Sequence, residues 1–99
     1  MKYQNKELSD NMNKLLKHMK SISKLESNSK SNWIVAIHLS FTDIKHIVFE
    51  SKLADGKIKY LLKILKNNQQ IKFERFFRGN ESNLTTAMWV ITKLGYQSI

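Results

Sequence analysis

The residues of this sequence that could do chemistry are cationic and aromatic. Of its 99 residues, 17 are Lys or Arg and 8 are Asp or Glu, so the formal net charge is +9. There is no cysteine, and the three glycines do not form a phosphate-binding loop. The histidines, His18, His38 and His46, have neither metal-ligand spacing nor an acidic cluster beside them, so we expect no metal and no cofactor. Cations beside aromatic rings suit a polyanion, above all a nucleic acid.

The arrangement of the basic residues carries more information than their number. All of them are lysines except Arg75 and Arg78, and asparagine and isoleucine are also abundant. An AT-rich coding sequence produces this mixture by drift, without any function. The elements that position the lysines therefore decide whether they form a surface.

The first element is an amphipathic helix predicted over residues 6–26. Its apolar stripe repeats at helical spacing and consists of Leu8, Met12, Leu15, Leu16, Met19 and Ile22. On the opposite side we expect Lys6, Lys17, Lys20 and Lys24. We interpret that lysine stripe as a solvated helix face, and residues 27–32 as a polar loop.

Alternating apolar residues then predict four strands, over 33–41, 44–53, 57–66 and 70–78. Thr42-Asp43, Asp55-Gly56 and Asn67-Asn68 are typical of tight turns between them. With two-residue loops at the last two turns, every inward pair is apolar on apolar, for example Leu53 with Ile58 and Leu62 with Phe73. A second helix is predicted after Gly79, with its cap at Asn80 or Ser82 and its end at Gly95.

These elements predict one domain, residues 1–99, of the α+β class. We expect a two-layer fold in which both helices pack on one face of an antiparallel four-stranded meander, in the order α-β-β-β-β-α. This order is similar to that of the double-stranded-RNA-binding domain. The chain departs from that family by its fourth strand and by the absence of a lysine cluster in Gly79–Leu84, so no family and no RNA-binding residues are assigned.

The other sheet face would be open to solvent and basic. Lys63 would lie opposite Lys72, and Lys57 opposite Arg78, although like charges across strands cost about 0.2–1 kcal/mol each. A polyanion lying across the sheet would offset this repulsion, and Phe76 could stack on a base. The main hypothesis is therefore a protein that binds RNA or single-stranded DNA and is not an enzyme. Its proposed contacts are Lys52, Lys57, Lys59, Lys63, Lys72, Arg75, Phe76 and Arg78.

Two alternatives stay open. The chain could be an interaction module, such as a small phage or mobile-element protein that docks on an acidic host factor. It could also be a small metal-free ribonuclease in which His38 and His46 meet across the first hairpin, with Lys45, Arg75 or Arg78 beside them.

Exposed apolar residues on the open face, such as Phe76 and Leu61, would also suit a homodimer interface or a surface covered by the C-terminal tail.

The sequence also predicts a compartment. The longest apolar run, Trp33–Ile37, is too short to span a membrane, and no signal-peptide pattern is present, so we expect no membrane partner. Because the chain lacks cysteine, an intracellular, cytoplasmic location is the natural expectation.

Overall fold

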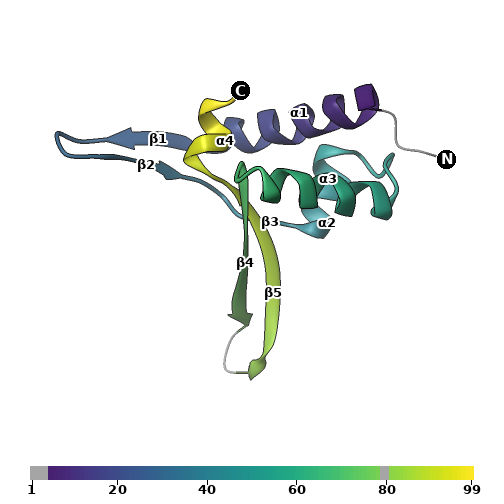
Figure 1. The fold of residues 1–99 in the computed structure, drawn as a ribbon. Coiled ribbons are helices and arrows are strands. Elements are labelled where there is room, and N and C mark those ends of the chain that lie inside the picture. Colours follow the sequence, from purple (N-terminus) through teal and green to yellow (C-terminus); the bar gives the residue numbers. More distant parts are fainter. Residues whose placement is uncertain (1–4, 79–80) are drawn as a thin grey trace.

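A computed structural model describes residues 5–78 and 81–99, and its side chains are described for 5–75 and 86–99. Helices lie on one side of the molecule, and two β-hairpins extend away from them in different directions (Figure 1). The elements in chain order are α1 (Asn5–Ser21), β1 (Lys24–Ser27), β2 (Asn32–Val35), β3 (Leu39–Ser40), α2 (Phe41–Asp43), the π-helical turn η1 (Ile44–Val48), α3 (Asp55–Asn67), β4 (Ile71–Arg78), β5 (Glu81–Ile91) and α4 (Lys93–Gln97).

The core is formed by three helical segments that pack on the base of a sheet. The buried side chains of α1, η1 and α3 meet those of β3, β4 and β5, and α3 contributes the largest share, four residues, because its apolar positions recur every three or four residues. The buried core consists of Leu15, Leu16, Met19, Leu39, Ile44, Val48, Phe49, Ile58, Leu61, Leu62, Leu65, Ile71 and Ile91.

There are two antiparallel sheets. In the three-stranded sheet β5 lies between β3 and β4, and β4 pairs with β5 from Ile71↔Ile91 through Phe73↔Trp89 and beyond. The β4–β5 hairpin runs from the helices down and away from the body (Figure 1). The second sheet is the β1–β2 hairpin, which pairs Lys24 with Val35 and Glu26 with Trp33 and extends to the left in Figure 1, in a different direction from the β4–β5 hairpin.

The prediction of an α+β fold with antiparallel pairing is confirmed, but the single four-stranded meander is wrong. Residues 44–53 are not a strand, because a capping box starts a helical segment at Ser40. The Ser40 hydroxyl accepts a hydrogen bond from the Asp43 backbone N–H at 3.1 Å, and the Asp43 carboxylate accepts one from the Ser40 N–H at 3.1 Å. The α2 and η1 segments then turn Ile44 and Val48 into the core.

Residues 57–66 belong to α3 and not to a strand. Ile58 and Leu62 would be buried in either structure, but Leu61, which the strand prediction placed outside, is fully buried. The buried residues of this segment are therefore spaced three and four apart, as in a helix, and not two apart, as in a strand. Asp55-Gly56 begins this helix and does not form a hairpin turn.

The C-terminal half contains the other main correction. The strand predicted over 70–78 is confirmed as β4, but residues 81–91 form its partner β5 and not a helix. Only α4 is helical there: its cap is Thr92, whose hydroxyl accepts the Gly95 N–H at 3.0 Å, so Gly95 lies inside the helix.

The N-terminal half departs in two smaller ways. The first helix ends at Ser21, and Lys24, which was expected on its polar face, lies in β1. The strand predicted over 33–41 is divided into β2 and β3. The order of the double-stranded-RNA-binding domain is therefore not present.

Candidate nucleic-acid interface

One side of α3 is buried and the other is cationic. Its buried residues lie on a single stripe, and at 100° per residue the opposite stripe carries the polar positions. We call this opposite stripe the outer face of α3. It consists of Gly56, Lys59, Tyr60, Lys63, Lys66 and Asn67, all of which are exposed.

The lysines of the outer face are not neutralised. Neither Lys59, Lys63 nor Lys66 forms an ion pair with any carboxylate among the described side chains. Lys59 instead lies over the Phe41 ring, 5.8 Å from its centroid. The three charges are therefore available to an anion outside the molecule.

A short helical segment and a turn fix the direction of α3. The chain leaves η1 through Phe49, which is buried, and its N–H donates to the Ile44 carbonyl at 3.2 Å. Glu50 and Ser51 then adopt positive φ angles of 53° and 62°, which reverses the chain before α3 begins. The helical turn η1, the reversal at residues 50 and 51 and the helix α3 therefore follow one another directly, and α3 presents the outer face.

A groove of about 230 Å³ separates α3 from the β4–β5 hairpin. Its lining residues are Lys59, Leu62, Lys63, Lys66, Phe73 and Trp89. The rings of Phe73 and Trp89, which are cross-strand partners, lie with their centroids 5.0 Å apart. The groove is apolar at its base and cationic along the helix side.

A fourth cation comes from the hairpin. Arg75 lies on the same sheet face as Phe73, two residues along β4, and its guanidinium carbon is 5.3 Å from the centroid of the Phe73 ring. Lys66 approaches the same ring at 5.6 Å. The Phe73 ring therefore contacts one cation from the helix, Lys66, and one from the hairpin, Arg75.

Lys45, which lies in η1, forms an ion pair with Asp55 at the start of α3. Lys45 donates to the Asp55 carboxylate at 2.6 Å, and this hydrogen bond holds the pKa of Asp55 below its usual value. The carboxylate also suits the positive end of the helix dipole. The ion-pair partner of Asp55 is therefore Lys45, and Lys59 of the outer face acts on this carboxylate only through a weaker charge interaction.

The residues predicted to bind nucleic acid are divided by the structure. It brings Lys59, Lys63 and Arg75 together. Lys57 turns to Glu7 at 3.1 Å, and Lys52, in the turn before α3, pairs with Glu50 at 3.3 Å. For three others the outcome differs: Lys72 lies on the other sheet face, 3.6 Å from Glu74, and the side chains of Phe76 and Arg78 are outside the described residues.

Other predictions for the open face fail because that face does not exist. Leu61 and Val48, expected to be exposed there, are buried in the core. Sequence reasoning in turn missed Tyr60, Lys66 and Trp89. The spacing of Lys59, Lys63 and Lys66 (i, i+4, i+7) is the signal that could have found the helical face.

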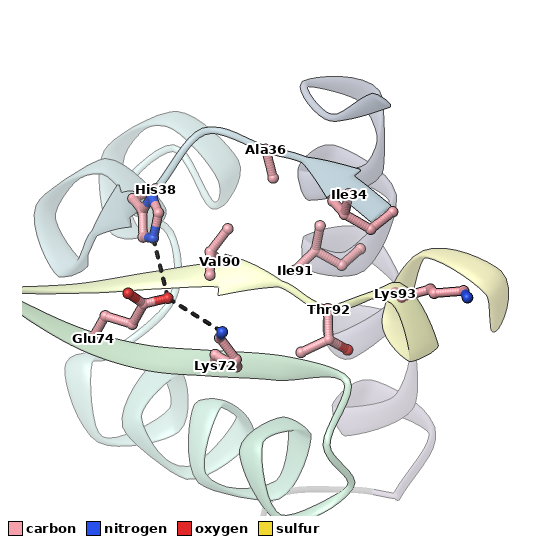
Figure 2. A pocket seen from close by; sticks show the side chains of 9 residues that line it. All are labelled: Ile34, Ala36, His38, Lys72, Glu74, Val90, Ile91, Thr92 and Lys93. Carbon is pink, nitrogen blue, oxygen red and sulfur yellow. Dashed lines mark hydrogen bonds and ion pairs between the residues drawn. The ribbon is translucent and has the colours of Figure 1, made fainter. Parts of the chain in front are cut away.

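The two histidines of the ribonuclease hypothesis have different partners. His38 precedes β3 and its Nε2 lies 3.4 Å from the Glu74 carboxylate, which also takes Lys72. These three side chains line a pocket of about 310 Å³ on the sheet face away from α3, shown in Figure 2. His46 lies in η1 and contacts the Ser51 hydroxyl at 2.5 Å. The hairpin predicted to join the two histidines is absent because residues 41–48 are helical.

Within residues 5–78 and 81–99, no group of His, Cys, Asp or Glu could hold a metal ion, and no helix is long and apolar enough to cross a membrane. The chain matches no protein-family model, no curated protein and no solved structure.

Proposed function

We propose that this protein binds double-stranded DNA through the outer face of α3. The observation that carries the proposal is the set of three lysines on the exposed face of α3, which have no carboxylate partner among the described side chains. We compare η1 and α3 with the first and second helices of a helix-turn-helix unit. An α-helix fits the major groove of B-form DNA, and the second helix of such a unit is the one that enters it. The β4–β5 hairpin, with Arg75, lies beside α3 where it would reach the adjacent phosphates.

The polar residues of α3 suit different parts of a duplex. The N-terminal half of a recognition helix contacts base edges, which assigns Lys59 and Tyr60 to the bases. Lys63 and Lys66, together with Arg75, would contact phosphates and release counterions. Gly56, at the start of the helix, leaves open space where a side chain would stand, so the backbone can approach the groove closely.

This proposal replaces the sheet surface expected for RNA or single-stranded DNA. Base stacking needs an accessible ring, whereas Phe73 is half-buried and has Lys66 and Arg75 over it. The deep, narrow major groove of A-form RNA does not admit a helix. A helix face with cations favours duplex DNA over both.

Fluorescence anisotropy with a labelled DNA duplex of mixed sequence tests the proposal. At low salt the duplex should bind about tenfold or more tightly than its single strand or the RNA duplex of the same sequence. The three phosphate contacts proposed for Lys63, Lys66 and Arg75 predict a slope of roughly −2.7 for log K against log salt. Equal affinity for all three nucleic acids, or a flat salt dependence, would contradict helix docking. Weak binding to all of them would instead support an acidic protein partner.

Gly56→Glu should reduce duplex binding by about 10- to 100-fold without unfolding the protein. A Cβ at this position meets no atom within 4 Å, so the helix accepts a side chain there, and an acid in the first turn suits the helix dipole. Its charge would face the DNA phosphates. Gly56→Ala is the matched control and should bind within a few-fold of the original protein. If Gly56→Glu binds as well as Gly56→Ala, α3 does not approach the DNA in this orientation.

A further inference from the structure

We propose that the β1–β2 hairpin is a self-association surface and that its partner is a second copy of this chain. The surface is the hairpin's outer face, formed by Trp33, Val35, Lys24 and Glu26 and continued by Ile37. It lies away from α3 and the β4–β5 hairpin (Figure 1), and the proposal does not depend on DNA binding.

The apolar side chains of this face are unusually exposed. Trp33 is 43%, Val35 53% and Ile37 61% exposed. Because side chains alternate along a strand, these three point to the same side, whereas Ile34 and Ala36 point into the pocket against the sheet (Figure 2). Neighbouring apolar groups on a surface mark an interaction site more often than single exposed residues do.

The hairpin has support within the molecule on one face only, where Ile34 packs against the core. In the described part of the chain, β1 and β2 form a two-stranded sheet, and all their residues are exposed except Glu26 and Ile34, which are half-buried. An isolated two-stranded hairpin is only marginally stable in water and needs further strands or packing against another layer. A second layer over Trp33 and Val35 would supply that packing.

Charge identifies the second layer as another copy of the chain. Two molecules of net charge +9 repel each other over most of their surfaces. On the outer face, however, Lys24 and Glu26 form an ion pair at 3.2 Å and cancel each other's charge. Lys24 stands across from Val35, and Glu26 across from Trp33.

This arrangement is self-complementary. In a two-fold dimer the same patch meets itself, so every charge must find its opposite in the other copy. If two outer faces stack about a two-fold axis that runs across the strands, Val35 of one protomer meets Trp33 of its partner, and Lys24 meets Glu26 of the partner beside them. An acidic partner would be attracted by Lys24 but repelled by Glu26.

Sedimentation velocity on the intact protein, free of nucleic acid, tests this inference. Between 5 and about 500 µM the mass should rise from 11.7 kDa towards twice that value. Val35→Lys should weaken the dimer by about tenfold or more, because it places a charge in the apolar centre. Ile47→Lys is the matched control: Ile47 is 57% exposed but lies in η1, so the dimer should persist.

The charge pair gives an independent test that spares the apolar residues. Lys24→Glu places two acids on each face and should weaken the dimer several-fold, and the double variant Lys24→Glu with Glu26→Lys should restore it. Circular dichroism verifies that each variant is folded. A monomer at every concentration would overturn the proposal. So would a dimer unaffected by Val35→Lys, or a double variant no better than the single one.

Discussion

Replacement of Lys59, Lys63 and Lys66 together by glutamine is expected to lower the affinity for duplex DNA by about 100- to 1,000-fold at low salt. The three side chains lie on one face of α3 and lack carboxylate partners among the described residues. Two of them, Lys63 and Lys66, are the proposed phosphate contacts, and each contact that is lost removes about 0.9 from the salt slope, so the slope should become shallower by about 1.8. Anisotropy titrations at four salt concentrations measure both quantities.

The control must remove the same charge from elsewhere. Lys6, Lys17 and Lys30 are exposed on α1 and in the β1–β2 turn, away from the outer face of α3. Their combined replacement by glutamine also lowers the net charge by three, from +9 to +6. We expect it to cost only a few-fold in affinity. Equal losses in the two triple variants would show that binding follows net charge and not the outer face of α3.

Gly95→Ala is expected to be the most destabilising conservative change in the chain. Gly95 is buried in α4, and an added Cβ would lie 2.1 Å from the carbonyl oxygen of Gln70, a backbone atom that cannot rotate away. That oxygen also accepts the Thr92 N–H at 3.1 Å, so α4 and the start of β4 would have to separate. Overpacking of this kind costs about 1–3 kcal/mol or more, which corresponds to a fall in Tm of roughly 5–20 °C.

The same substitution at another helical glycine provides the comparison. Gly56→Ala meets no atom within 4 Å, and alanine favours a helix by up to about 1 kcal/mol over glycine, so its Tm should stay level or rise slightly. Thermal unfolding followed by circular dichroism compares the two variants directly. A Tm for Gly95→Ala close to that of Gly56→Ala would show that α4 does not pack closely on Gln70.

The sequence predicted correctly those elements whose apolar residues fit the period of a helix or the period of a strand, but not both. Leu8 to Met19 fits only a helix, and Ile71 to Phe77 fits only a strand, so α1 and β4 are found where they were expected. The stretch from Ile58 to Leu65 fits both periods, because Ile58, Leu62 and Ile64 are apolar at even spacing while Leu61 and Leu65 complete a helical stripe. Local pattern alone cannot decide between such alternatives.

The basic character of the chain, its α+β class and the candidacy of Lys59, Lys63 and Arg75 followed from the sequence by itself. Their common location was decided only by tertiary structure. Burial of Leu61 in the core that it shares with residues of α1 and η1 makes residues 55–67 a helix, and pairing with β4 makes residues 81–91 a strand. Those contacts join residues that are distant in the sequence. The free energy that favours a helix over a strand therefore depends on tertiary packing and cannot be predicted from a short stretch of sequence. The cationic surface thereby moves from a sheet face to a helix face, and the proposed ligand changes from single strands to a duplex.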